Sequence, residues 1–322
     1  MRRHRNGLRG VKQLQYSEKR VSEFHRILEC VLAINPLQRK RIETFLEQAS
    51  KEYWTFAEEL SCNLNHSFLL SDEDRIAVAK AYKKMCMDLL REQIRFKKSG
   101  VFHEGNAGEV YKQVYSQDDV MRYYLVGLLL SYLFWPNHYK MFRFFQETTA
   151  QLMAGNYLEV GAGHGLFTAE IRKKYPEMDM TIVDISKTAI DLATEIISSF
   201  RIDASSINFM NHDFLKINLD GQKFDFIAMG EVLEHVTNPL QFLCKARELI
   251  SPEGLMYMST CVNAPAIDHI YHFMDVISIQ TLLQKAGFLI TSEIILPVED
   301  VTEDKWFSEL VPINYAAICR PL

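Results

Sequence analysis

The sequence predicts an α/β fold: a Rossmann-like, doubly wound and mostly parallel seven-stranded sheet, preceded by an all-helical domain. From residue 17 to 150, apolar side chains recur at intervals of three and four residues, which is the spacing of amphipathic helices. After residue 155, short β-rich runs alternate with helical stretches, as in a parallel sheet with helices on both faces. A glycine-rich turn follows the first of these runs, where a strand of such a sheet passes into a helix.

The helical domain is predicted over residues 17–150, after a basic flexible tail at residues 1–16. The first twenty residues hold seven lysines and arginines against a single acid, and we interpret them as a frayed tail rather than a phosphate-binding arm. Ser71, followed by three acids, predicts the start of a helix. The longest apolar run, residues 123–135, predicts a buried helix because it is too short to cross a bilayer.

The α/β domain is predicted over residues 151–322. Its strands are expected at 157–160, 180–183, 207–210, 224–229, 255–260, 288–295 and 314–319. Its helices are expected at 167–174, 187–200, 239–250 and 279–286. Pro252, Glu253 and Gly254 predict a turn before the fifth strand. Because ligands of such sheets bind beyond the carboxyl ends of the strands, functional residues are expected there.

Composition narrows the classes of function. The net charge of −5 argues against a dedicated nucleic-acid binder, so nucleic acid is not an expected partner. The six cysteines form no C-x-x-C pair, which argues against a zinc knuckle or a disulfide framework and favours reduced thiols in the cytoplasm. No apolar segment follows the basic N-terminus, so neither a secretory signal nor a membrane span is expected.

The glycine-rich turn runs from Glu159 to Gly165 and has the spacing G-x-G-x-G rather than the G-x-G-x-x-G of nicotinamide-binding folds. Glycines at alternate positions let the backbone approach a ligand closely. Asp184 ends the second predicted strand, twenty-five residues after Glu159. An acid there can accept both hydroxyls of a ribose, which supports a nucleoside cofactor without choosing among cofactors.

Several strings resemble the class I S-adenosylmethionine-dependent methyltransferases. The glycine turn resembles their motif I, E-V-G-x-G-x-G, and residues 231–236, EVLEHV, resemble a motif of the ubiquinone-biosynthesis-like branch. Residues 249–254, LISPEG, resemble that branch's L-x-P-G-G turn, although Glu253 stands where glycine is common. The resemblance covers about residues 150–320. It implies that residues 151–322 form an S-adenosylmethionine-binding methyltransferase domain, with residues 17–150 as a helical cap or substrate domain.

The resemblance also implies which residues hold the cofactor. Gly161 and Gly163 would border it, and Glu159 would support its amino group or the loop. Asp184 would bind the ribose, while Asp213 and Phe214 would bind and cover the adenine, unless Asp213 only caps a turn. The cofactor-binding residues expected on this basis are Glu159, Gly161, Ala162, Gly163, Asp184, Ile185, Asp213, Phe214, Gly230 and Glu231.

Candidate catalytic residues follow the fourth and fifth predicted strands. Methyl transfer is an in-line displacement in which alignment supplies much of the rate, and a histidine can take the acceptor's proton. His235, Glu234 and His269 are the expected catalytic residues, although His235 could equally cap the next helix or pin its own loop. The expected substrate contacts are Tyr115, Tyr124, His138, Asp268 and His272. Aromatic residues at helical spacing are also typical of a hydrophobic core.

A metal site is a less favoured alternative. The E-x-x-E-H spacing with a later histidine resembles the divalent-metal site of small-RNA 3′-end methyltransferases, and would use Glu231, Glu234, His235 and His269. Carboxylate and imidazole ligands suit Mg²⁺, Mn²⁺ or Fe²⁺. The same string occurs in metal-free relatives, so S-adenosylmethionine alone is the expected cofactor.

The leading hypothesis is therefore methyl transfer from S-adenosylmethionine to an oxygen or nitrogen of a small, partly apolar acceptor, in secondary metabolism. Three alternatives remain open. They are a metal-assisted RNA methyltransferase, a protein that uses or keeps the same cofactor without methylating, and a nicotinamide-dependent oxidoreductase. The last shares the glycines and Asp184 but leaves the E-x-x-E-H string unexplained. The sequence does not predict an oligomeric state.

Overall fold

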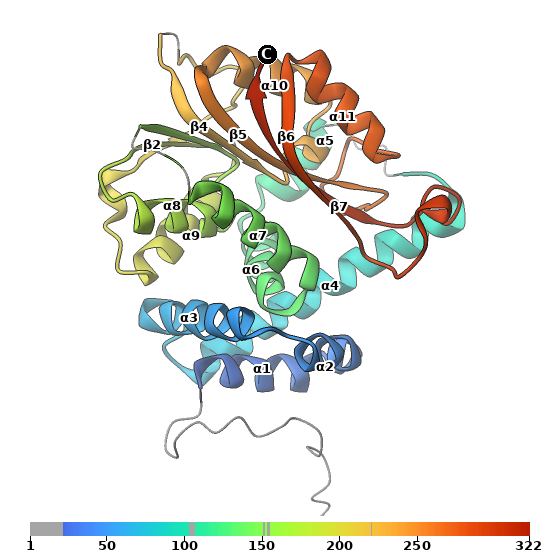
Figure 1. The fold of residues 1–322 in the computed structure, drawn as a ribbon. Coiled ribbons are helices and arrows are strands. Elements are labelled where there is room, and N and C mark those ends of the chain that lie inside the picture. Colours follow the sequence, from blue (N-terminus) through green and yellow to red (C-terminus); the bar gives the residue numbers. More distant parts are fainter. Residues whose placement is uncertain (1–21, 103–106, 151, 153–154, 220) are drawn as a thin grey trace, which may run out of the picture.

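The computed structural model describes residues 22–102, 107–150, 152, 155–219 and 221–322 (Figure 1). The basic tail predicted at residues 1–16 lies outside the described residues. The first half of the described chain is helical, as the apolar periodicity predicts. Its helices are α1 (Glu23–Ile34), α2 (Arg39–Glu47), α3 (Lys51–Ser67), α4 (Asp72–Ser99), α5 (Ala107–Val110), α6 (Asp118–Phe134) and α7 (Pro136–Thr149), with a short π-helix at Tyr111–Tyr115.

Local signals set the limits of the longest helix, α4. The Ser71 hydroxyl accepts from the Asp74 amide while the Asp74 carboxylate accepts from the Ser71 amide, which forms a capping box at the N-terminus. Gly100 ends the helix in the left-handed conformation. Helix α6 contains most of the apolar run and is mostly buried from Tyr124 to its end. That run is therefore a core helix.

The second half forms one seven-stranded sheet in the order β3-β2-β1-β4-β5-β7-β6. Strands β1 to β5 run parallel, and β7 pairs antiparallel with both β5 and β6. The predicted fold class is confirmed. The strands are β1 (Asn156–Val160), β2 (Asp179–Asp184), β3 (Asn208–Asn211), β4 (Phe224–Gly230), β5 (Ile250–Val262), β6 (Phe288–Pro297) and β7 (Ile313–Pro321).

Strand β5 begins earlier than predicted. Phe224 of β4 pairs with Ile250, and the next register pair joins Phe226 to Leu255, so residues 251–254 form a bulge within the strand. Pro252 has no amide hydrogen to donate to a sheet, and Gly254 packs against the Phe224 carbonyl where a Cβ would lie 3.0 Å from that oxygen. The turn expected at residues 252–254 is thus a bulge at the start of β5.

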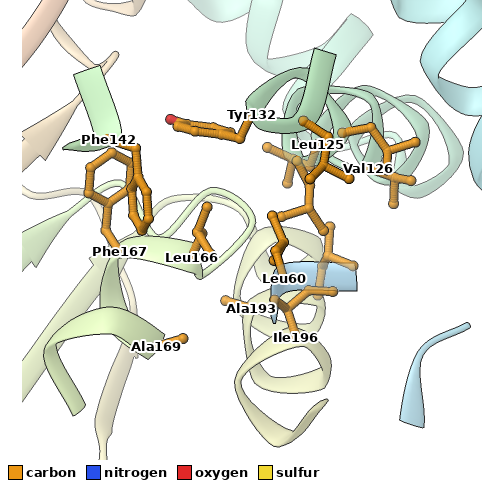
Figure 2. Close-up of a cluster of buried hydrophobic side chains, with 14 of the residues drawn as sticks. Leu60, Leu125, Val126, Tyr132, Phe142, Leu166, Phe167, Ala169, Ala193 and Ile196 are labelled. Atoms are coloured by element: carbon orange, nitrogen blue, oxygen red, sulfur yellow. The ribbon is translucent and has the colours of Figure 1, made fainter. Parts of the chain in front are cut away.

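Helices cover both faces of the sheet. Helices α10 (Pro239–Leu249) and α11 (Val276–Lys285) pack on one face, within a separate core cluster. Helices α8 (Leu166–Lys174) and α9 (Lys187–Ser199) cover the other face, and the helical half packs over them. Figure 2 shows this interface, where Leu60 of α3 and Leu125 and Val126 of α6 lie near Ala193 and Ile196 of α9.

One continuous core therefore joins the helical half to the sheet. Tyr132 of α6 and Phe142 of α7 point toward Phe167 of α8 in the same interface (Figure 2). Tyr132 of α6 contacts His164 of the glycine loop, whereas α1 and α2 lie farthest from the sheet (Figure 1). Among the described helices, none has both the length and the apolar character that crossing a membrane requires.

Candidate cofactor and acceptor site

The glycine loop links β1 to α8 at the carboxyl edge of the sheet. Gly161, Gly163 and Gly165 all have positive φ, at 85°, 50° and 80°. A Cβ on Gly165 would lie 2.8 Å from the Cα of Ala193, so this glycine is required for packing against α9. A Cβ on Gly163 would meet no atom within 4 Å. Gly163 therefore borders open space, as a position that approaches a ligand should.

Glu159, near the end of β1, supports this loop through side-chain hydrogen bonds. Its carboxylate accepts from the Tyr157 hydroxyl at 2.7 Å and from the Thr168 hydroxyl at 2.6 Å. Burial raises the pKa of Glu159 to about 7, while the two hydroxyls lower it. Because Thr168 belongs to α8, Glu159 ties the strand to the helix. Of the two roles expected for Glu159, these bonds favour support of the loop.

Asp184 ends β2 beside the same loop. Its carboxylate accepts from the Ser186 amide at 2.7 Å and lies 3.4 Å from the Gly163 nitrogen. Burial raises its pKa to about 6, and the neighbouring amides oppose that rise. The following residue, Ile185, has an exposed apolar side chain. The acid and the open glycine thus meet at one point of the sheet edge, with an apolar surface next to them.

Asp213 and Phe214 follow β3. Asp213 accepts from the Leu215 amide at 3.0 Å and pairs with Lys216 at 2.9 Å, which is the geometry of a capped turn. Phe214 is buried against Phe242, with a ring separation of 5.5 Å. Its ring therefore already has a protein partner. Leu215 is the exposed apolar side chain of this turn.

Two glutamates lie in the segment after β4. Gly230 leads into Glu231, which has a positive φ of 52° and donates its amide to the Ser259 carbonyl at 3.1 Å. Glu234 is buried and accepts from the Thr260 hydroxyl at 2.7 Å. Burial and the charge of Glu234 raise the pKa of Glu231 well above its ordinary value, and burial raises that of Glu234 to about 7. Each of these carboxyl groups is therefore stabilised by a bound proton or by a cation nearby.

His235 follows Glu234 and is held by the loop after β5. Its Nδ1 lies 3.1 Å from the Asp268 carbonyl oxygen and 3.4 Å from the Asp268 carboxylate. Its Nε2 lies 3.9 Å from the Glu234 Oε1. The His269 ring packs edge-on at 4.8 Å, and burial lowers the pKa of His269 to about 4. A neutral His269 therefore stands beside His235.

A tyrosine of the helical half contacts both Asp268 and His235. The Tyr115 hydroxyl donates to the Asp268 carboxylate at 3.5 Å, and the Tyr115 ring packs edge-on against His235. Burial, followed by the charge of Asp268, raises the pKa of Tyr115 and of Tyr124 well above 10. Two of the aromatic residues expected to contact substrate thus lie next to Asp268.

The other two expected substrate residues lie elsewhere. His138 is buried, bonds Ser131 at 2.6 Å, and has its pKa lowered to about 3 by burial. His272 stacks on Phe102 at 4.2 Å and bonds Asn263 at 2.8 Å. The structure therefore brings Tyr115, Tyr124 and Asp268 together but does not place His138 or His272 with them.

Sequence reasoning passed over His164, which occupies the variable position of the glycine turn. It is buried against Tyr132, with a ring separation of 5.2 Å, and burial lowers its pKa to about 4. It also missed Ser259 and Thr260, which hold the two glutamates. The sequence signal for these two residues was a pair of hydroxyl side chains near the end of an otherwise apolar predicted strand.

The residues of the less favoured metal site also meet. One ligand atom from each of Glu234, His235 and His269 lies within 4.8 Å of the others, as is true of Glu231, Glu234 and Cys261. Glu231 Oε1, Glu234 Oε1 and Asp268 Oδ1 are buried and have no hydrogen-bond partner in the part of the chain that the structure describes. His269 Nδ1 already bonds the Ala264 carbonyl at 2.6 Å, which leaves Nε2 as its remaining ring nitrogen.

Comparison with known proteins agrees with this geometry. Residues 153–305 match a family described as a methyltransferase domain. A ubiquinone biosynthesis O-methyltransferase from Coxiella burnetii is 30% identical over 139 residues, covering 43% of this chain and 57% of the relative. A malonyl-[acyl-carrier protein] O-methyltransferase from Halalkalibacterium halodurans is 26% identical over 106 residues, covering 32% and 38%.

Among solved structures, an O-methyltransferase family protein from Burkholderia thailandensis is 13% identical, with a TM-score of 0.51. The match covers 76% of this chain and 71% of that protein, and it supports the fold. The chain spans about half the length of the curated relatives that it matches. The motifs, the sheet order and the matched region agree. The C-terminal half of this chain is therefore a class I S-adenosylmethionine-dependent methyltransferase domain.

Proposed function

We propose that this chain transfers a methyl group from S-adenosylmethionine to an oxygen or nitrogen of a small, partly apolar acceptor of secondary metabolism. The observation that carries the proposal is the meeting of Asp184 with Gly163, whose backbone borders open space at the sheet edge. The O-methyltransferase names of the relatives support an oxygen acceptor. When bound, S-adenosylmethionine supplies an electrophilic methyl group on a sulfonium.

The described residues fit this cofactor. Gly163 leaves the loop backbone accessible, and Asp184 offers carboxylate oxygens to the two ribose hydroxyls. Ile185 and Leu215 provide exposed apolar surface for an adenine ring. Glu159 bonds Tyr157 and Thr168 and keeps the loop in place. No basic side chain is needed, because the cofactor carries no phosphate.

His235 is the residue best placed to accept the acceptor's proton. Its Nδ1 faces two oxygens of Asp268, the carbonyl and the carboxylate, so Nδ1 carries the ring proton and Nε2 is left as the basic nitrogen. Asp268 therefore fixes both the tautomer and the orientation of the ring. Tyr115 donates to the same carboxylate and contacts the ring, so the helical half helps to position the base.

Calorimetry with S-adenosylhomocysteine tests the cofactor assignment. We expect micromolar binding by the wild-type chain, and a loss of about 100-fold in Asp184→Ala, because two hydrogen bonds to a charged group disappear. Undiminished affinity in Asp184→Ala, or tight NADH binding in place of S-adenosylhomocysteine binding, would contradict the proposal. A gain of 14 daltons on candidate acceptors, by mass spectrometry, tests the transfer itself.

A divalent cation is a second candidate, favoured by one observation. Among the described residues, three buried carboxylate oxygens, on Glu231, Glu234 and Asp268, have no hydrogen-bond partner, and Glu234 and Asp268 lie beside His235. A cation bound by Glu234, His235 and His269 would neutralise them and could polarise an acceptor oxygen. If it binds, removing metal with a chelator lowers the melting temperature, and Mg²⁺ or Mn²⁺ restores it. No change on either step would exclude a required metal.

A further inference from the structure

An open groove lies outside the candidate site, on the helical half. Ile34 at the end of α1 and six side chains of α4 line a groove of about 510 Å³. This volume is in the range of small-molecule sites. The lining residues are Ile34, Lys80, Lys83, Lys84, Met87, Asp88 and Arg91. Their spacing along α4 places them on one face of that helix, and α1 packs alongside α4 (Figure 1).

The charge of this groove is positive and poorly compensated. Its acid, Asp88, is already engaged, because it pairs with Arg91 at 2.7 Å and accepts from the Tyr123 hydroxyl at 2.9 Å. Within the part of the chain that the structure describes, Lys80, Lys83 and Lys84 have no carboxylate at ion-pair distance. Like charges three and four residues apart destabilise a helix, so the three lysines repel one another unless an anion lies among them.

Tyr123 of α6 contacts two of the residues that line the groove, Lys84 and Asp88. The Lys84 Nζ lies 3.6 Å from the centre of the Tyr123 ring, and the Asp88 bond holds the Tyr123 hydroxyl in place. Tyr123 precedes Tyr124, which is buried toward Asp268. After burial and Asp88, the charge of Asp268 also contributes to raising the pKa of Tyr123. Tyr123, which contacts Lys84 and Asp88 of the groove, is therefore the neighbour in α6 of a tyrosine of the acceptor site.

From these observations we infer that the groove is a binding site for a small molecule that carries a phosphate group. Lys80, Lys83 and Lys84 would surround the phosphate as flexible point charges, which is how lysine binds phosphate. Ile34 and Met87 would contact a less polar part of the molecule. The inference goes beyond methyl transfer, because the groove is built from helices of the first half and uses no residue of the cofactor site.

Titration of the full chain with pyrophosphate, at constant ionic strength, tests the site. The variant Lys80→Glu/Lys83→Glu changes two exposed lysines without removing a described partner. Its matched control is Lys285→Glu/Lys305→Glu, which makes the same change of charge on two exposed lysines of the other half. We expect saturable binding by the wild type, a loss of about tenfold or more in the groove variant, and little change in the control.

Three outcomes would overturn the inference. They are an absence of saturable pyrophosphate binding by the wild type, equal weakening in both double variants, and much tighter, groove-dependent binding of a single-stranded RNA oligonucleotide, which would mark a nucleic-acid surface. Melting temperatures confirm that both variants fold. S-adenosylhomocysteine binding is measured in parallel on the same proteins. Its absence would count against the proposed function, whereas pyrophosphate binding alone decides the groove.

Discussion

The two ends of the candidate site are built in different ways. The cofactor end consists of the glycine loop and Asp184, which follow neighbouring strands and interact through backbone amides. The acceptor end brings together Glu234 and His235 after β4, Asp268 after β5, and Tyr115 from the helical half. Backbone geometry therefore fixes the first end, while side chains from distant segments fix the second. The two ends should therefore respond differently to substitution.

The largest effect is expected at the acceptor end. His235→Ala should lower methyl transfer by about 100- to 10,000-fold, the range for loss of a general base, because no other described imidazole has an oxygen pair fixing its tautomer in this way. S-adenosylhomocysteine affinity should change little. His272→Ala is the matched control, since this ring stacks on Phe102, and it should lower the rate by less than about threefold. Equal losses in the two variants, in a mass-spectrometric assay, would refute the assignment.

The cofactor end should respond through folding. Gly165→Ala places a Cβ 2.8 Å from Ala193 at a positive φ, and should lower the free energy of unfolding by about 3 kcal/mol. Gly163→Ala has the same backbone strain but open space, and should cost about 1 kcal/mol while weakening S-adenosylhomocysteine binding. Urea denaturation and calorimetry separate the two effects. Equal destabilisation by both substitutions would contradict the difference in packing.

The buried acid under the loop gives a pH-dependent stability. Burial raises the pKa of Glu159 from 4.5 to about 7. A carboxyl whose pKa is raised by folding stabilises the folded state fully below pH 4.5 and loses that contribution as the pH rises through about 7. Glu159→Gln keeps an oxygen that can accept from Tyr157 and Thr168. It should raise the free energy of unfolding by about 3 kcal/mol at pH 8 and hardly change it at pH 4. Urea denaturation at both pH values measures the difference, and a gain that does not depend on pH would contradict it.

The smallest effect is expected in the binding of cofactor at low pH. Burial raises the pKa of Asp184 from 3.8 to about 6, and only the ionised carboxylate accepts freely from both ribose hydroxyls. S-adenosylhomocysteine affinity should therefore fall about tenfold between pH 7 and pH 5. Asp184→Asn should bind more weakly at pH 7 and lose this pH dependence, as measured by calorimetry. A wild-type affinity that is constant from pH 7 to 5 would show that Asp184 does not contact the ligand.

Some elements were predictable because their signals are local. Ser71 and the acids after it mark the start of α4, and the strand that ends at Glu159 and Val160 follows from its apolar pattern. The bulge at residues 251–254 was not predictable, because Pro252 and Gly254 also suit an ordinary turn. Only the pairing with β4 shows that Ile250 and Leu255, on either side of the bulge, belong to one strand. The glycine turn was predictable because its residues are consecutive in the chain.

The sequence by itself determined the fold class, the glycine turn and the candidate ribose-binding acid, since each depends on neighbouring residues and on the order of strands. Only the tertiary structure decided which tyrosines reach Asp268 and that His138 does not join them. It also assembled the groove from Ile34 and α4. The physical reason is that side chains far apart in the chain meet only after the helices pack. No single segment of the sequence specifies how the core packs.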